Sequence, residues 1–566
     1  MTAPAESVDG SFVPDERESR EPESHGQRSR IQAWRQQPWD ADRIAAWAFG
    51  AYLLVAFVYC LNRGADSWFS GDEWQFLVNK HSVVDMLRPQ NGHWSTTPIV
   101  VYQMLSFLFS LQSYMPFLVV LVSMHLALAT LIRAALRMSG VRGWLATVVA
   151  GSFVLFGPGE QNILQAVQIS MVATMLAGFG QMLLAQHDGR FNRRDAAGIA
   201  VGAIGLMASG IGPPMAMVVG LAVLVRRGWL VAAAHTAPLA GLYGVWFLAF
   251  NDSIGFSSGP RPPGSEVFAW MSTGMRGVFV SLGRFEMAAA VMAVAFVVGL
   301  ALAGSSSTFS EIRRHAAIPI AGLLGAPLLF AVISTTRWLI GSQAALSSRY
   351  ISMATAMALP AIGYSFEHLT RRFAPSGYAL SAVLLLAFPA NITMIGTQGL
   401  QPAFFEGQRE LAVAIGRSPL ARQVPPDSKA DRNFLGLARV PTGFLVEAWD
   451  DGMLPGNVAV SPKTDLQVVV RLGFEQRPEP APTGACDLLP VPFTGTLPSG
   501  TVLRMVPGNA PAMTVVATGV NADGTDGGGL DFAFAGGSDL RSHLPDLPWR
   551  IHTPTGGTLL RCERAG

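Results

Sequence analysis

Charged side chains are scarce in this sequence. They make up 14% of its 566 residues, against 50% hydrophobic residues, whereas soluble globular domains are about one quarter charged. This balance is too apolar for a water-soluble protein of this length and predicts an integral membrane protein. The 40 basic and 38 acidic residues nearly cancel, so the basic excess with which proteins bind nucleic-acid phosphates is also lacking. Nucleic acid is therefore not expected as a partner.

Carboxylates are lacking at the centres of the apolar segments, where ion-coupled transporters place their coupling charges. The polar residues found there, His125, His235 and Asn391, occur singly and are expected to form hydrogen bonds between helices. The sequence also contains no His-Glu-x-x-His motif and no Gly-rich phosphate-binding loop. These absences argue against a transporter, a zinc peptidase and a nucleotide-dependent enzyme.

Composition divides the chain into three parts. Residues 1–42 are rich in Glu, Ser, Arg and Pro and are predicted to be a disordered cytoplasmic tail. Residues 43–400 alternate apolar stretches with short loops and form a predicted transmembrane domain, in which 63–113 is a long outer loop. Residues 401–566 are rich in Gly, Pro and short apolar stretches, which predicts an extracytoplasmic β-sandwich-like domain.

The distribution of arginine predicts the orientation of the chain. We expect eleven spans, and under this count the arginine-bearing loops near residues 137, 193, 226, 313 and 371 all fall on one side. By the positive-inside rule that side is the cytoplasm, which leaves the C-terminal domain outside. The predicted fold class is an α-helical polytopic protein of the plasma membrane with a β-rich outer domain. The expected spans are 43–62, 114–136, 144–157, 163–185, 195–209, 213–225, 229–250, 285–304, 316–336, 350–368 and 376–397, and the expected strands include 466–474, 501–506, 513–520, 530–535 and 558–562.

Cysteine occurs only three times. Cys60 lies in the first predicted span, whereas Cys486 and Cys562 both lie in the domain placed outside, where oxidising conditions allow a disulfide. We predict a bond between these two; the alternative is two buried free thiols.

The carboxylates gather instead in the first outer loop, which carries the adjacent pair Asp72 and Glu73. Trp74, Leu77 and Val78 follow at helical spacing, which predicts a short amphipathic helix on the membrane surface. One interpretation is that the two acids only begin this helix, where they favour its dipole. A second apolar surface helix is predicted over 99–111, because Pro98 is typical of a helix start.

These features together resemble the GT-C superfamily of membrane glycosyltransferases. The resemblance rests on an N-terminal span, an early acidic pair in the outer loop, the stretch Asn91-Gly92-His93-Trp94-x-x-x-Pro98, a surface helix and a late Arg349-Tyr350 step. It covers about residues 43–370. Members of the superfamily include protein O-mannosyltransferases and mycobacterial arabinosyltransferases, and they use polyprenyl-phosphate sugars as donors.

The resemblance implies roles for individual residues. Asp72, or its neighbour Glu73, would be the base that takes the proton of the acceptor hydroxyl, and single displacement would invert the anomeric centre. Arg349 is the first candidate for binding the donor phosphate, followed by Tyr350, His93 and Arg337. The acceptor would be a cell-envelope glycan or glycolipid on the outer face.

The remaining candidates for substrate contact are Asn91, Trp94 and Glu160. Each candidate also has a structural interpretation: the two arginines as interfacial anchors, His93-Trp94 as part of an aromatic belt, and Glu160 as a polar helix start rather than a second acid or metal ligand. A divalent cation is the one cofactor that the resemblance leaves open, although no Asp-x-Asp or paired-histidine spacing supports it.

Two other functions are kept as alternatives. A flippase or transporter of lipid-linked saccharides would share the many spans but should contain a polar cavity within the membrane. A non-catalytic membrane scaffold would act through the outer domain and would tolerate loss of Asp72.

Overall fold

The structure is a computed structural model. It describes residues 40–566 except for 81, 251–259, 398, 400, 432–434, 478–482, 498–500, 507–512, 521–525, 535–538, 543–548, 553–558 and 565–566. Nearly all of the tail predicted over 1–42 lies outside the described residues.

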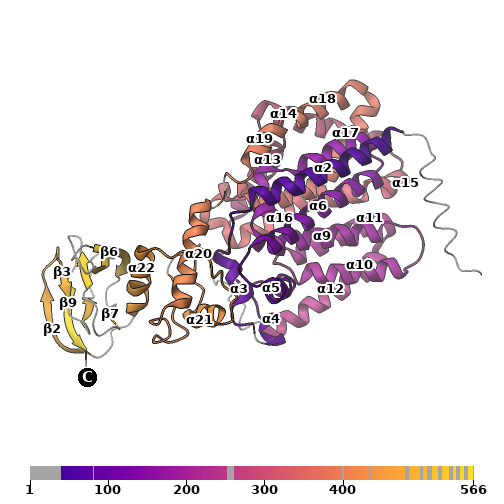
Figure 1. The fold of residues 1–566 in the computed structure, drawn as a ribbon. Coiled ribbons are helices and arrows are strands. Elements are labelled where there is room, and N and C mark those ends of the chain that lie inside the picture. The colour runs from indigo at the N-terminus through magenta and orange to yellow at the C-terminus, as the bar shows by residue number, and fades with distance from the viewer. Residues whose placement is uncertain are drawn as a thin grey trace, which may run out of the picture.

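The membrane part is a bundle of helices that lie side by side (Figure 1). Among the described residues, seven helical segments are long and apolar enough to cross a membrane: Ala41–Arg63, Met115–Met138, Ala166–Ala185, Trp229–Phe250, Glu286–Ser306, Phe309–Ile340 and Ala374–Met394. The helices are α2 (Ala41–Arg63), α6 (Met115–Met138), α7 (Gly143–Val154), α9 (Ile169–Ala185), α10 (Arg193–Leu206), α11 (Gly212–Arg227), α12 (Trp229–Phe250), α13 (Gly264–Gly283), α14 (Glu286–Ser306), α15 (Phe309–Glu311), α16 (Ala317–Arg337), α17 (Ser348–Arg372), α18 (Ala374–Leu386) and α19 (Phe388–Met394).

The predicted count of eleven spans is not reproduced, although a helix covers each of them. Helices α7, α10 and α11 have only 12, 14 and 16 residues, fewer than the ~20 that cross a bilayer. Helix α13 was not predicted at all, because Glu266, Ser272 and Thr273 interrupt its apolar pattern. It packs through Gly274 on Phe330 of α16.

Helix α17 is enclosed by the rest of the bundle. From Tyr350 to Phe366 every residue is buried, although the helix contains more Ala, Ser and Met than large aliphatic residues. Small residues let helix backbones approach closely. Gly322 of α16 lies against the Met357 carbonyl and Gly299 of α14 against Ser365, so α17 is held by close packing rather than by its own hydrophobicity.

The two ends of the bundle differ in charge. We call one the arginine-rich end, because interhelical bonds gather its loops: Arg137 donates to Asp42 at 2.5 Å, Arg371 to the Gly140 carbonyl at 2.9 Å, and Arg313 to the Arg226 carbonyl at 3.1 Å. The opposite end, here the loop end, carries the loop after α2 and the C-terminal part of the chain (Figure 1). The arginine-bearing loops therefore do share one side, as the arginine distribution predicts.

The loop after α2 contains the 3₁₀ turn Gly71–Glu73 and the helices α3 (Trp74–Leu77), α4 (Val83–Leu87) and α5 (Thr96–Phe109). The prediction that α3 lies on the membrane is wrong. Its Trp74 is fully buried and packs against Phe444 of the C-terminal part, and its Phe76 packs on Tyr102. Helix α5 fits the predicted surface helix, because it buries one face and leaves large apolar side chains exposed on the other: Val100, Met104, Phe107 and Leu108.

The C-terminal part begins with three helices, α20 (Pro402–Arg417), α21 (Thr442–Asp450) and α22 (Pro462–Gly473). The strand predicted over 466–474 is wrong for all but its last residue, because this stretch is helix α22. Its start is capped by the Ser461 hydroxyl, which accepts from the Thr464 N–H at 3.3 Å, and Val468 and Leu472 bury one helical face at a spacing of four residues.

Two antiparallel sheets follow. One has the order β1-β7-β4-β9-β2 and the other β3-β8-β5-β6. Leu503, Leu540 and Leu559 of the first sheet share a buried cluster with Leu497 and Ile551 of the second, which makes the domain a sandwich. Cys486 of β2 is bonded to Cys562 of β9. The strands are β1 (Phe474–Arg477), β2 (Thr483–Leu489), β3 (Thr494–Leu497), β4 (Val502–Met505), β5 (Met513–Val520), β6 (Asp526–Phe534), β7 (Asp539–Ser542), β8 (Trp549–His552) and β9 (Leu559–Arg564).

Candidate active site at the loop end

The adjacent acids Asp72 and Glu73 have different surroundings. Glu73 is only 1% exposed, and its carboxylate accepts hydrogen bonds at 2.7 Å from the hydroxyls of Tyr102 and Tyr114 and at 2.8 Å from the Ser70 N–H. Burial raises the pKa of Glu73 to about 7, against the opposing effect of these hydrogen bonds. Glu73 therefore ties the start of the loop to α5 and α6 and does not face solvent.

The Asp72 side chain, in contrast, is 37% exposed. It forms an ion pair with Arg439 at 2.7 Å and accepts a hydrogen bond from the Gln75 amide at 3.3 Å. The Arg439 guanidinium also donates to the Asn91 side-chain oxygen at 3.0 Å. One residue of the C-terminal part thus brings together two residues that the sequence singled out, Asp72 and Asn91.

His93 and Arg337 lie close enough for the charge of the arginine to act on the histidine. The His93 ring lies against Gly210, in the turn between α10 and α11. Burial lowers the pKa of His93, and the nearby positive charge of Arg337 lowers it further. A neutral His93 can accept or donate one hydrogen bond at each ring nitrogen, depending on its tautomer.

Arg349 and Tyr350 begin α17 at the same end. The Arg349 guanidinium lies over the Tyr350 ring, 5.0 Å from its centroid. The backbone here is fixed by α8 (Gln161–Leu164), since the Asn162 amide donates to the Arg349 carbonyl at 3.2 Å. Within the described part of the chain, neither Arg349 nor Arg337 forms an ion pair with a carboxylate. Tyr350 itself is buried.

The Trp94 side chain is buried and is not accessible to solvent. Its ring stacks on Trp246 of α12 with centroids 4.9 Å apart, and its indole N–H donates to the Thr96 hydroxyl at 2.8 Å. Trp246 in turn donates to the Leu87 carbonyl at 2.8 Å. This packing fastens the loop to the bundle and leaves the Trp94 ring without a free face for a sugar.

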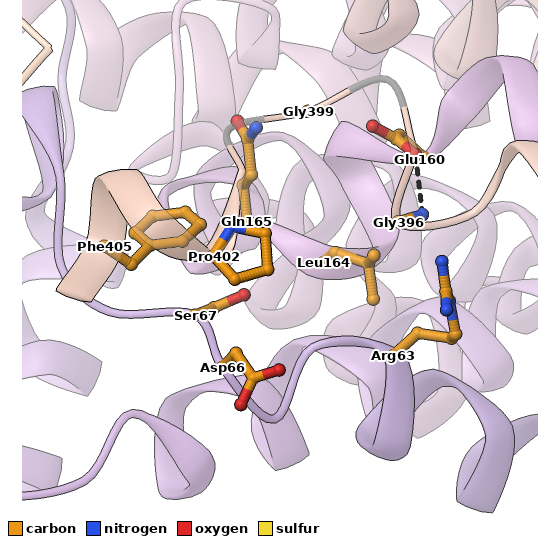
Figure 2. Close-up of a pocket in the computed structure, with 10 residues that line it drawn as sticks. All are labelled: Arg63, Asp66, Ser67, Glu160, Leu164, Gln165, Gly396, Gly399, Pro402 and Phe405. Carbon is orange, nitrogen blue, oxygen red and sulfur yellow. Dashed lines mark hydrogen bonds between the residues drawn. The ribbon is translucent and has the colours of Figure 1, made fainter.

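Glu160 lines a pocket of about 450 Å³, part of it open to solvent. Figure 2 shows Glu160 and Gly399 across the pocket from Asp66 and Ser67, with Arg63 beside them. The Glu160 carboxylate accepts from the Gly396 N–H at 2.8 Å, and Arg63 donates to the Ile395 carbonyl at 3.0 Å. Asp66 and Arg63 were not picked out from the sequence, although both lie at the start of the loop that was.

A short chain of hydrogen bonds runs from the residue after the pocket to the residue after Asp72. Gln165 of the pocket precedes Ala166, whose N–H donates to the Tyr114 hydroxyl at 2.7 Å. That hydroxyl donates to Glu73, the neighbour of Asp72. Tyr114 therefore links the backbone beside the pocket to Glu73.

The described residues contain no group of three or more His, Cys, Asp or Glu side chains that could hold a metal ion. Asp72 has an arginine as its close partner rather than a second carboxylate. The described residues of this end do not fit a divalent-cation site.

Two of the three polar residues predicted to form hydrogen bonds between helices do so, whereas the buried side-chain oxygen of the third, Asn391, has no hydrogen-bond partner among the described residues. The His125 ring bonds the Val154 carbonyl at 3.1 Å, and His235 bonds Asp195 at 3.0 Å. Asp195 is completely buried at the start of α10, where it also binds Arg227. Its role was not predicted, because Arg227 lies 32 residues away.

No protein-family model and no curated protein matches the chain. A solved structure that does match is the crystal structure of ArnT from Cupriavidus metallidurans in the apo state. The match has 13% sequence identity and a TM-score of 0.35, and it covers 76% of this chain and 92% of that chain. The class of protein is therefore defined by the features of this chain: it is a polytopic helical membrane protein with a polar site at one end and a β-sandwich beyond it.

Proposed function

We propose that the protein is a membrane glycosyltransferase that moves a sugar from a polyprenyl-phosphate donor to a cell-envelope acceptor at the outer face of the plasma membrane. The observation that carries this proposal is the partly exposed Asp72 carboxylate, which lies at the same end of the bundle as Arg337 and Arg349. A base beside cationic groups suits a reaction in which a hydroxyl loses a proton and a phosphate leaves.

Asp72 is the proposed base. Its carboxylate takes the proton of the acceptor hydroxyl as that oxygen attacks the anomeric carbon. The bond from the anomeric carbon to the phosphate oxygen breaks, and polyprenyl phosphate leaves with the electron pair. With one base and no separate nucleophile, the anomeric centre is inverted. Glu73 is withdrawn as an alternative base, because it is buried and fully hydrogen-bonded.

Arg349 and Arg337 are the proposed partners of the donor phosphate. Guanidinium groups without a carboxylate partner remain available for bidentate hydrogen bonds to phosphate. A neutral His93 beside Arg337 can add one more hydrogen bond. Tyr350 supports Arg349 through its ring, and Asn91 and Trp94 support the loop rather than the sugar.

The pocket lined by Glu160 and Asp66 is the proposed binding place for the polar part of a substrate. Its two acids and Arg63 offer both acceptors and donors to sugar hydroxyls. The exposed apolar face of α5 supports a position of this end at the membrane surface, where an isoprenoid chain can lie among lipids while its phosphate stays at the interface.

The test is transfer of labelled sugar from polyprenyl-phosphate donors to endogenous acceptors in membranes that contain wild type, Asp72→Asn or Asp85→Asn at matched levels. Asp85 is a matched control, because it is a partly exposed acid of the same loop, with a side chain that is 27% exposed. The proposal expects product with wild type and Asp85→Asn and its loss with Asp72→Asn. The proposal is contradicted if all three proteins give equal product, or if none gives product with any donor. Transport of lipid-linked saccharides or a scaffold role would then take its place.

A further inference from the structure

A second pocket lies at the arginine-rich end, on the side of the bundle opposite the candidate active site. Together with the solvent at its mouth it encloses about 390 Å³. Its polar lining consists of Ser139 after α6, Gln186 after α9, Arg226 in the last turn of α11, and Arg314 and His315. No carboxylate is among its lining residues, so the pocket presents mainly hydrogen-bond donors and positive charge.

Two of these donors are buried without an acceptor. The Gln186 amide nitrogen and the Arg226 Nε atom have no hydrogen-bond partner among the described residues, and the Arg226 side chain is only 10% exposed. A buried donor without a partner is destabilising. Gln186 and Arg226 both line the pocket, so a ligand that accepts hydrogen bonds there would give these side chains a partner.

The charge around the pocket agrees with this. The Nη2 atom of Arg226 forms an ion pair with Asp188 at 2.9 Å, and the Asp188 side chain is 77% exposed. Arg314 is exposed and forms no ion pair within the described part of the chain. Other arginines of this end already have acidic partners, since Arg227 binds Asp195 and Arg142 binds Glu367.

Arg314 and His315 are held in an unusual backbone conformation. Residues Ile312–Ala316 form a π-helical turn between α15 and α16. Such turns are rare in proteins, and those that occur are often found at functional sites. The His315 ring bonds the Met138 carbonyl at 3.3 Å, and Arg313 donates to the Arg226 carbonyl at 3.1 Å. The turn is thus fastened to α6 and α11, on both sides of the pocket.

We propose that this pocket binds a phosphate group, with Gln186, Arg226 and Arg314 as its donors. Such a phosphate belongs either to the head group of an anionic lipid or to a soluble phosphate compound, and basic pockets between helices at a membrane face suit both. The site is independent of the proposed glycosyl transfer, because it lies at the other end of the bundle.

Purified protein in detergent tests this inference with three probes: phosphatidylglycerol, phosphatidylcholine and inorganic phosphate. Thermal stabilisation is measured for wild type, Arg314→Gln, Gln186→Leu and Arg372→Gln. Arg372 is the matched control, because it is an exposed arginine of the same end outside the pocket. Arg314→Gln and Gln186→Leu should each weaken binding by roughly fivefold or more, with no loss of stability before ligand is added, while Arg372→Gln binds as wild type does.

The probes separate the two sources. Stabilisation by phosphatidylglycerol but not by phosphatidylcholine or inorganic phosphate supports a lipid phosphate, and stabilisation by inorganic phosphate supports a soluble compound. The inference is overturned if neither anionic probe stabilises the protein. It is also overturned if Arg372→Gln weakens binding as much as Arg314→Gln, since general surface charge would then explain the effect.

Discussion

At the scale of single residues, two neighbouring acids of the first loop have been given different environments. The sequence predicts that Asp72 and Glu73 belong to one candidate site, but it does not predict which of them is accessible. That depends on Tyr102 and Tyr114, which lie 29 and 41 residues from Glu73. Arg439, the partner of Asp72, comes from still farther along the chain and has no local pattern that marks it.

Glu73 should make stability depend on pH. Its pKa is raised to about 7 in the fold, from about 4.3 in an unfolded chain, so the folded protein binds one more proton between these values. The contribution of Glu73 to stability is fully present below about pH 4.3, falls by on the order of 4 kcal/mol as the pH rises to about 7, and stays constant above that pH. Melting temperatures of wild type and Glu73→Gln between pH 4.5 and 8.5 measure this.

Glu73→Gln cannot ionise, so the difference between it and wild type should change across that window. Glu447→Gln, a change at an exposed glutamate of α21, should keep the wild-type profile. Parallel profiles for wild type and Glu73→Gln would show that Glu73 does not titrate in this range.

Arg439 should act as a positioning residue for Asp72. Arg439→Gln removes the ion pair while Asp72 remains, so we expect transfer to fall by roughly tenfold, less than with Asp72→Asn. Arg439→Lys should restore part of the activity, because an ammonium can pair with Asp72 but cannot bridge to Asn91 in the same way. Initial rates at saturating donor measure the three variants. Equal rates for Arg439→Gln and wild type would remove Arg439 from the account.

At the scale of helices, the long apolar segments were predictable and the polar or short ones were not. Helices α2, α6, α12 and α14 follow their hydrophobic runs, whereas α13 was missed and α22 was taken for a strand. Helix α22 is mostly polar on one face, and its apolar residues lie close together in a short stretch, where strand and helix patterns are hard to separate. Its cap at Ser461 was the signal that favoured a helix.

Close packing between α16 and α17 should make Gly322 sensitive to substitution. A methyl group there meets the Met357 carbonyl, and backbone cannot move aside as a flexible side chain does. Gly322→Ala should destabilise the protein by about 1–3 kcal/mol. Gly304→Ala in α14, where nothing lies within 4 Å, should leave the melting temperature in detergent unchanged or raise it. The reverse order would contradict this packing.

The buried Asp195 should be the acid on which the α10–α12 region depends. Asp195→Ala leaves the Arg227 charge buried without its partner, and we expect a loss of about 3–5 kcal/mol. Asp465→Ala removes an exposed acid that pairs with the exposed Arg417 and should cost less than about 1 kcal/mol. Thermal unfolding in detergent compares the two, and similar losses would mean that Asp195 is not buried as described.

At the scale of the whole molecule, the proposed function requires that the loop end of the bundle faces the outside. We expect Ser113→Cys, at the loop end, to react with a membrane-impermeant maleimide in intact cells, and Arg190→Cys, at the arginine-rich end, to react only after lysis. Both positions are exposed, and the native cysteines do not compete, because Cys60 is buried and the other two are bonded. Labelling in the opposite order would place the candidate active site in the cytoplasm.

The central claim is that Asp72 is the base of a sugar transfer at the loop end. The most direct measurement is the rate at which purified protein in proteoliposomes converts a polyprenyl-phosphate sugar and an acceptor into polyprenyl phosphate and glycosylated acceptor, for wild type and Asp72→Asn. We expect wild type to form equal amounts of both products, with inverted anomeric configuration. We expect Asp72→Asn to react at least about 100-fold more slowly. Transfer by Asp72→Asn at the wild-type rate would contradict this claim.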